Sequence, residues 1–273
     1  MGTHPAQRGQ YFDLLYFLAW RDVRVRYKQS LLGIGWAVIL PVSMMLVFTF
    51  VLSRAVTLPT SPGERLPYAL YAFAGLVPWT YFSMSLSGCM QSLVANRNLV
   101  TKVYCPREVF PFSSIASSTV DFGISLVVLA CLMVYFRMTG AWVPDSSAWS
   151  VASFAAFPLL LLLQLMLTAG AGLVLAMGNL FYRDVRPMFT IGIQLLMFLS
   201  AVVIPVPSHD TLSGFLIRLN PLVSLMQGYR SVLLRGEFPP AADVLHAAFF
   251  GVTMLALGWV LFQRLSHRFA ERI

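Results

Sequence analysis

Apolar stretches without charge recur along the chain at a length that fits the width of a membrane. Six of them cover residues 29–53, 66–96, 109–136, 146–182, 187–209 and 244–263, and only the third contains an acid, Asp121. Crossing the hydrocarbon core takes about 20 apolar residues in a helix. Backbone groups in lipid must also bond within their own segment, which a helix achieves. The sequence therefore predicts an all-α polytopic membrane protein with six spanning helices, at 34–52, 68–94, 112–136, 151–177, 187–206 and 244–263.

The stretch between the last two predicted spans is unusually apolar for an outer loop. Residues 207–240 hold two groups of apolar side chains at helical spacing, which the Asn220-Pro221 pair separates. Because irregular backbone at membrane depth must be covered by protein or line a cavity, the pattern predicts two short re-entrant helices on the periplasmic side. A pair of helices that lies flat on the outer interface is the alternative interpretation.

The first 30 residues show a different pattern. Between Gln10 and Gln29, aromatic and apolar side chains recur at spacings of three and four, and basic side chains recur on another face. Such a helix suits the headgroup boundary of a membrane. We therefore predict an amphipathic interfacial helix in residues 1–30 and a membrane domain in residues 31–273; a basic anchor with no further role is the alternative. The apolar stripe comprises Tyr16, Trp20, Val23 and Tyr27, and the basic stripe comprises Arg21, Arg24 and Lys28.

Charge is scarce and unevenly distributed. Only 11% of the residues are charged and 58% are hydrophobic, against about 25% and about 45–50% in soluble domains. With the N-terminus inside, thirteen of the 19 lysines and arginines fall on the cytoplasmic side, as the positive-inside rule requires. Both termini are therefore expected in the cytoplasm. The net charge of +8 is explained by anionic lipid and requires no nucleic acid.

Motifs for common catalytic chemistry are missing from the sequence. No G-x-x-x-x-G-K-[ST] phosphate loop occurs, so nucleotide is not expected to bind in that way. The four histidines are scattered along the chain and predict no metal site. We expect a transporter that is not an enzyme and that takes its energy from another polypeptide.

Three strongly polar side chains fall well inside the predicted spans, away from their ends. A charge near the bilayer centre is costly, so Asp121 is expected to face the bundle interior or a wet cavity. It is either a proton-relay residue, as an ion-coupled secondary transporter would need, or a buried group paired with a neighbouring hydroxyl or arginine. Gln164 and Gln194 either line a hydrophilic path or join two helices by a hydrogen bond.

Aromatic residues crowd the outer half of the second predicted span. An interfacial belt explains Tyr71, whereas Trp79, Tyr81 and Phe82 are predicted to lie deeper. Because aromatic faces stack on sugar rings, these residues are candidates for a glycan path, together with the two glutamines. Bulky side chains that face lipid are the alternative.

The inner loop between the second and third predicted spans is the best candidate for a protein contact. Asn98 is expected to cap a short helix that ends before Pro106. Its apolar side chains would be exposed unless a partner covers them or they fold back on the ends of the spans. The predicted contact residues are Asn98, Leu99, Val100, Thr101, Lys102, Val103 and Tyr104.

Four motifs resemble, in the same order, those of ABC-2 type permeases that export polysaccharides. They are WRDVRVRYKQSLLGIGWA at 20–37, NRNLVTKVYCPRE at 96–108, NLFYRDVR at 179–186 and NPLVSLMQGYR at 220–230. The resemblance covers essentially the whole chain. It implies a permease for a lipid-linked polysaccharide such as O-antigen, in the inner membrane of a bacterium. A permease for a drug or a simple lipid is the alternative within this class.

The resemblance also implies partners and roles. The permease is expected to be a homodimer with two copies of a separate ABC ATPase subunit, which bind the ATP and magnesium. The loop helix would be the coupling helix that docks on the ATPase, and residues 211–235 would form short periplasmic gate helices. The implied residues are Arg21, Arg24, Arg26 and Lys28 on a cytoplasmic gate helix, near where a lipid-diphosphate head enters, and Phe215, Leu219, Tyr229 and Arg230 in the periplasmic gate.

Overall fold

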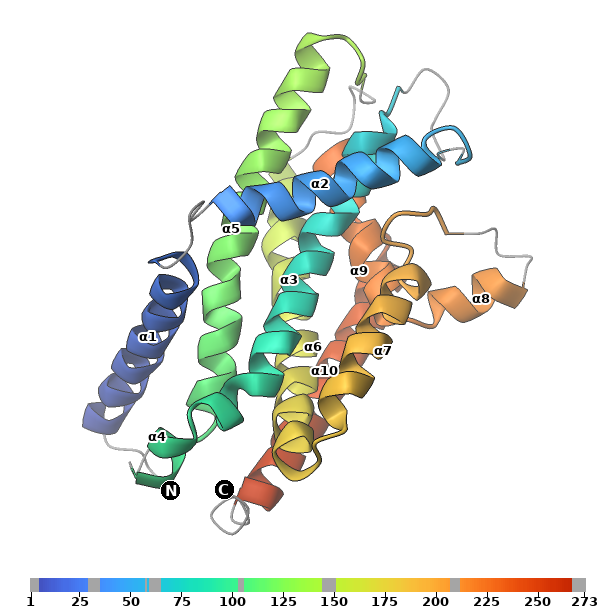
Figure 1. The fold of residues 1–273 in the computed structure, drawn as a ribbon. Coiled ribbons are helices and arrows are strands. Elements are labelled where there is room, and N and C mark those ends of the chain that lie inside the picture. The colour runs from blue at the N-terminus through green and yellow to red at the C-terminus, as the bar shows by residue number, and fades with distance from the viewer. Residues whose placement is uncertain are drawn as a thin grey trace.

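The chain folds into a bundle of helices, with no strand in the residues that the structure describes (Figure 1). The computed structural model describes residues 5–28, 35–56, 58, 65–102, 106–143, 151–206 and 212–266. A π-helical turn at Ser231–Arg235 follows the ninth helix. The helices are α1 (Pro5–Lys28), α2 (Gly35–Leu52), α3 (Tyr68–Ala95), α4 (Arg97–Lys102), α5 (Val109–Met138), α6 (Val151–Phe181), α7 (Val185–Leu199), α8 (Leu212–Arg218), α9 (Pro221–Arg230) and α10 (Ala241–Ser266).

Among the residues that the structure describes, four helices are long and apolar enough to cross a membrane, namely α2, α5, α10 and residues Ala155–Phe181 of α6. They coincide with the first, third, fourth and sixth predicted spans. α3 has 28 residues and matches the second predicted span, but its tyrosines and serines make it less apolar. α7 is apolar but has only 15 residues. The chain is a multi-pass membrane protein, and each of its predicted spans contains a helix.

The fifth predicted span is too long. α7 ends at Leu199 rather than at residue 206, although the residues that follow are apolar. Ala201 has a φ of 50°, a left-handed conformation that a residue other than glycine adopts only where its surroundings hold it there. Carbonyl groups of residues 199–203 accept hydrogen bonds from side chains of other segments. These tertiary contacts end α7.

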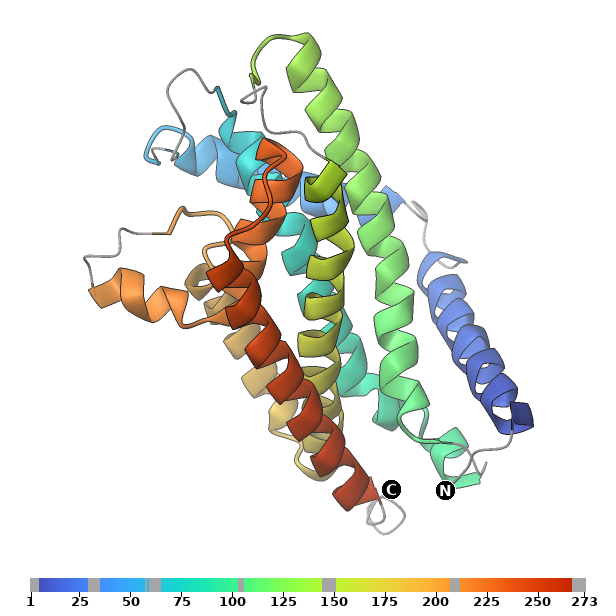
Figure 2. The same ribbon diagram turned by 180° about the vertical axis from the view of Figure 1, so that it is seen from behind.

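α3 is the central helix of the bundle. It contacts α2, α5, α6, α7 and α9, and most of its side chains are buried. Because other helices of the same chain cover it, α3 can carry polar residues that a helix facing lipid could not. α6 and α10 pack against each other on the side seen in Figure 2.

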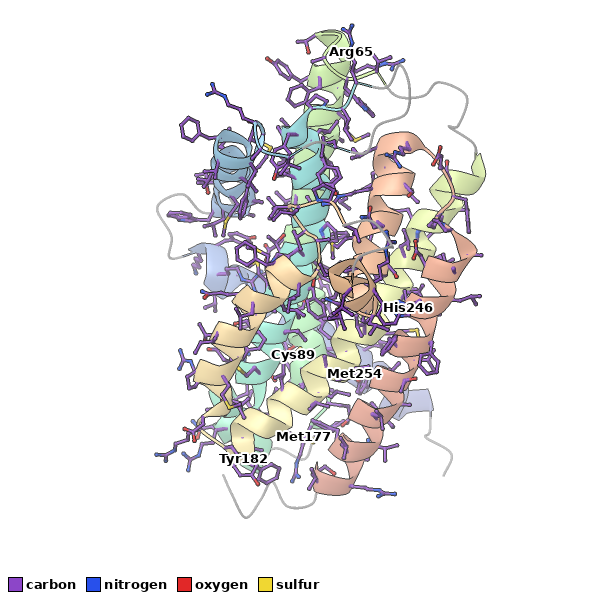
Figure 3. All side chains as sticks on the ribbon, turned by 90° about the vertical axis from the view of Figure 1, so that its right-hand side faces the viewer. Arg65, Cys89, Met177, Tyr182, His246 and Met254 are labelled. Atoms are coloured by element: carbon purple, nitrogen blue, oxygen red, sulfur yellow. The ribbon has the colours of Figure 1, made fainter. Side chains whose placement is uncertain are left out.

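Two glycines allow α6 and α10 to approach closely. A Cβ atom on Gly170 would overlap the backbone carbonyl of Met254, which Figure 3 labels. A Cβ atom on Gly258 would overlap the carbonyl of Gly170 in return. Small residues at helix crossings allow membrane helices to bring their backbones together. Here the backbone of α6 contacts the backbone of α10 directly.

α1 and α2 lie at the edge of the bundle in different orientations. α1 runs alongside one half of α5, and α2 crosses the bundle at a large angle (Figure 1). Leu18 of α1 is buried beside Val109 and Phe110, whereas the rings of Tyr16 and Trp20 stack on each other and are exposed. The first half of the predicted aromatic stripe, Tyr16 and Trp20, therefore faces outward, whereas Val23 and Tyr27 are partly buried.

The two ends of the bundle hold different parts of the chain. The start of α1, the short helix α4, the turn between α6 and α7 and the end of α10 lie together at one end (Figure 1). Arg65 lies at the opposite end from Tyr182, which is in that turn (Figure 3). This grouping agrees with the sidedness that the distribution of basic residues predicts.

The apolar outer stretch forms two helices, as predicted, and Asn220 separates them by capping α9. Both lie beside the bundle rather than beyond its end (Figure 1). α9 packs against α3, α6 and α10, and its apolar side chains are buried. α8 instead exposes Leu212, Phe215 and Leu216.

Candidate functional site

The four basic residues between Arg21 and Lys28 at the end of α1 divide into an inner and an outer pair. Arg21 donates to the side chain of Asn96 over 2.8 Å and forms an ion pair with Asp22 at 2.9 Å. Arg26 contacts Asp121 and Ser117 of α5. The outer pair comprises Arg24, whose guanidinium lies 5.5 Å from the ring centre of Trp20, and Lys28, and both are exposed.

Asp121 is held by α1. Its carboxylate accepts hydrogen bonds from Arg26 and from the hydroxyl of Tyr27, and only 7% of the residue is exposed. Burial raises the pKa of Tyr27, and the hydrogen bond to the carboxylate raises it further. The prediction of a buried acid paired with a hydroxyl or an arginine is confirmed. Both partners come from the interfacial helix, which sequence reasoning did not foresee.

Two cavities meet at Arg26. One, of about 460 Å³, lies between α1, α3 and α5 and has a mixed lining with several polar side chains; we call it the polar cavity. The other, of about 440 Å³, is mainly apolar and lies between the end of α1 and helices α2, α3 and α5. The polar cavity is lined by Arg21, Asp22, Ser92, Asn96, Ser114 and Ser117, and the apolar cavity by Trp36, Leu40, Met44, Tyr81, Met84 and Phe122.

Serines on α5 were missed as site residues, although their spacing could have revealed them. Ser114, Ser117 and Ser118 are buried and share one face of the helix with Asp121 and Ser125. Spacings of three and four residues place such side chains in a stripe. The stripe faces α1 and α3 and gives the polar cavity part of its polar wall. A helix that was apolar all round could not do this.

Asn96 joins three helices. It is the residue between α3 and α4, and its side-chain amide donates to the carbonyl of Ser92 over 2.8 Å. Its side-chain oxygen is the acceptor for Arg21 of α1, and its carbonyl accepts from the amide of Leu99 in α4 over 2.9 Å. Asn96 thereby links α1 to both α3 and α4.

The predicted coupling helix is present as α4, with a different start. α4 begins at Arg97, so Asn98 lies in its first turn and the prediction that Asn98 caps it is wrong. The reason is that Asn96 already ends α3 and provides the connection. Leu99 is 36% exposed. Val103 and Tyr104 lie outside the described residues, as do the side chains of Val100, Thr101 and Lys102.

A second constellation surrounds Arg230 of α9, which is 4% exposed. Its guanidinium donates to the carbonyls of Ala201 and Val202 and lies 3.8 Å from the ring centre of Tyr71. Tyr68 donates to the carbonyl of Val203 over 2.8 Å. α3 and α9 thus supply the donors that the bent segment after α7 needs, because buried carbonyls are costly when unpaired.

The predicted path and gate residues meet where Arg230 lies against Tyr71, and the others are spread over several helices. Trp79, Tyr81 and Phe82 are buried, so the interpretation that they face lipid is wrong for the single chain; Tyr81 lines the apolar cavity. Gln164 donates to the carbonyl of Pro78 over 2.7 Å and joins α6 to α3, whereas Gln194 is exposed on α7. In the predicted periplasmic gate, Phe215 and Leu219 are exposed, and Tyr229 and Arg230 are buried.

The amino-acid sequence matches the family model described as ABC-2 type transporter over residues 13–234. The chain belongs to the ABC-2 type transporter family. The match includes α1, α4 and α9, the helices that carry the contacts described above.

Three ABC-2 relatives cover almost all of the chain. The O-antigen export system permease protein RfbA of Klebsiella pneumoniae is 28% identical over 268 residues, which are 96% of each chain. The RfbA protein of Myxococcus xanthus is 29% identical over 267 residues, covering 97% of this chain and 96% of that one. The polysialic acid transport protein KpsM of Escherichia coli is 23% identical over 244 residues, covering 89% and 90%.

Proposed function

We propose that this ABC-2 protein is the permease subunit of an ATP-driven exporter that moves a lipid-linked polysaccharide of the O-antigen type out of the cytoplasm. The observation that carries this proposal is its end-to-end relation to proteins named as O-antigen export permeases, at 96% coverage of both chains. The energy comes from a separate ABC ATPase, which binds ATP and magnesium. The permease itself carries out no chemical step.

In the membrane, the proposed arrangement has six crossing helices. α3 and α7 join the four that are long and apolar enough on their own, and α8 and α9 fill the outer leaflet as re-entrant helices. The end of the bundle with α4 faces the cytoplasm of a bacterial cell, with both termini. Two copies pair through α2 and α7, whose apolar faces are exposed in one chain. Two ATPase subunits bind at the cytoplasmic end of this dimer.

The proposed transport step couples α4 to the dimer interface. Closure of the ATPase subunits on ATP displaces α4, and the paired α2 and α7 helices part. The lipid-linked glycan meets the outer basic pair of α1, Arg24 and Lys28, by its anionic head and is threaded outward. The alternative of an ion-coupled transporter has lost its main support, because Asp121 is paired with Arg26.

Coupling through α4 predicts that the Leu99→Asp variant loses ATP turnover. A charge at a hydrophobic docking contact removes an interaction of the kind that carries most of the binding energy, so we expect a fall of about tenfold or more. The measurement is ATP hydrolysis by the complex with its ATPase in nanodiscs. Met138→Asp, at an exposed apolar position at the far end of α5, is the control and should hydrolyse ATP normally. Failure of the chain to bind any ABC ATPase would contradict the proposal.

The headgroup role predicts that reversing both outer charges, in Arg24→Glu/Lys28→Glu, abolishes export of polysaccharide to the cell surface. Both side chains are exposed, so the variant should still assemble with the ATPase. Surface polysaccharide is measured in cells that lack the native permease, with Arg65→Glu at the other end of the bundle as the control. Normal export by the double variant would remove the headgroup role from these two residues.

A further inference from the structure

The Arg26–Asp121 contact is the polar connection between the last turn of α1 and α5. Residues adjacent in sequence, Arg26 and Tyr27, both bond to the single carboxylate of Asp121, which lies about 18 Å along α5 from its first residue at a rise of 1.5 Å per residue. A carboxylate in an apolar setting binds strongly to the cations and donors that reach it, because water does not compete. The contact therefore fixes the position of the last turn of α1 relative to α5.

Arg26 is also the residue that the two cavities share. On one side lies the polar cavity with Arg21 and the hydroxyls of Ser114 and Ser117. On the other lies the apolar cavity with Leu40, Met44 and Phe122. A polar cavity with two guanidinium groups next to an apolar one matches a molecule with an anionic head and a hydrocarbon chain.

Within this arrangement the carboxylate of Asp121 binds Arg26 in the way that an anion from outside the protein would. Arginine binds carboxylate and phosphate through the same planar set of donors. A phosphate or diphosphate head brings more negative charge and more acceptor oxygens than one carboxylate, and it would compete with Asp22 for Arg21 in the polar cavity as it competes with Asp121 for Arg26.

We propose that Asp121 is an internal competitor that holds α1 against α5 through Arg26, and that the phosphate head of a lipid displaces it and releases α1. This inference rests on the proposed function in one respect, that α1 meets an anionic lipid head. It adds a regulatory step, because α1 stays in place until such a head arrives. Release of α1 would open the apolar cavity, whose wall includes Tyr27 and Asp121 themselves.

The test follows the exposure of a thiol on the buried face of α1. Leu18, 2% exposed and packed beside Phe110, is replaced in Leu18→Cys after the three native cysteines are changed to alanine. The rate of its modification by N-ethylmaleimide is measured in the complex with the ATPase, in phosphatidylcholine nanodiscs. Asp13→Cys, on the exposed side of α1, gives the rate for a thiol that is always accessible.

We expect slow modification in the Leu18→Cys parent and modification about tenfold faster when Asp121→Asn is added, because the population of displaced α1 rises. Undecaprenyl diphosphate should accelerate modification of the parent and have little further effect on Asp121→Asn. The exchanged pair Arg26→Asp/Asp121→Arg should restore slow modification, which a merely misfolded variant would not. Equal rates in the parent and Asp121→Asn, or equal acceleration of both by the lipid, would overturn the proposal.

The source of the phosphate is decided by a further arm. Acceleration by phosphatidylglycerol as well as by undecaprenyl diphosphate supports competition by any anionic lipid of the bilayer, whereas acceleration by undecaprenyl diphosphate alone assigns it to the carrier. Because the readout requires neither export nor the outer residues Arg24 and Lys28, it can fail while the proposed function stands. Loss of export in Arg24→Glu/Lys28→Glu, in turn, says nothing about the Arg26–Asp121 contact.

Discussion

The Gly170→Leu variant is expected to yield little folded protein. A side chain at this position would have to occupy the space of the Met254 carbonyl on α10, and the neighbouring Gly258 is itself in contact with the Gly170 backbone. Overpacking a core usually costs about 1–3 kcal/mol because side chains can rearrange. Here the opposing atoms are backbone, so α6 and α10 must separate along their contact.

Fluorescence-detected size exclusion of detergent-solubilised protein measures this loss directly, as the yield of the monodisperse peak and its decay on heating. Gly123→Leu is the matched control: a Cβ atom on Gly123 of α5 meets nothing within 4 Å, so the same substitution should leave yield and thermal stability close to those of the parent. Equal behaviour of the two variants would show that α6 and α10 do not pack through Gly170.

Replacing Arg230 by methionine is expected to destabilise the protein by about 2–6 kcal/mol, because two buried carbonyl groups lose their donor at a cost of about 1–3 kcal/mol each. Methionine fills similar space but leaves the carbonyls of Ala201 and Val202 without their donor. Arg230→Lys keeps the charge but not the planar set of donors, so its stability should lie between that of the parent and that of Arg230→Met. Thermal unfolding of the purified permease in nanodiscs measures the series.

The ring of Tyr71 provides an internal control for the same site. Its hydroxyl has no hydrogen-bond partner among the described residues, so Tyr71→Phe should unfold at the same temperature as the parent. Tyr71→Leu removes the aromatic face under the guanidinium and should cost about 0.5–2 kcal/mol. If Arg230→Met were as stable as the parent, the end of α7 would be fixed by some other contact.

The helices could be predicted well from the sequence because uncharged length is a direct consequence of bilayer thickness. The α2 helix begins one residue after the predicted start and ends at the predicted residue, Leu52. The end of α7 could not be predicted, since Ser200 to Val206 are as apolar as the helix before them. What stops the helix is the set of donors from Tyr68 and Arg230, which lie far away in sequence.

The site was predictable in its residue types and not in its pairings. The basic stripe of α1 and the lone acid Asp121 were evident from the sequence, but Arg26 and Asp121 are 95 residues apart, and nothing in either segment identifies the other. The exposed aromatic stripe drew attention to Tyr16 and Trp20, whereas the face that packs on the bundle is that of Leu18. Periodicity showed that α1 has two faces, and only packing determined which one is buried.

Asn96, the single residue between α3 and α4, connects helices that would have to move together in the permease. Asn96 is bonded to Arg21 of α1 on one side and to Leu99 of α4 on the other, while α3 extends from it through the centre of the bundle. If α4 docks on the ATPase and α1 meets the lipid head, as proposed, Asn96 connects both of these helices to α3. The nucleotide cycle and the admission of substrate would then both act through this one residue, and loss of its hydrogen bonds would disconnect them.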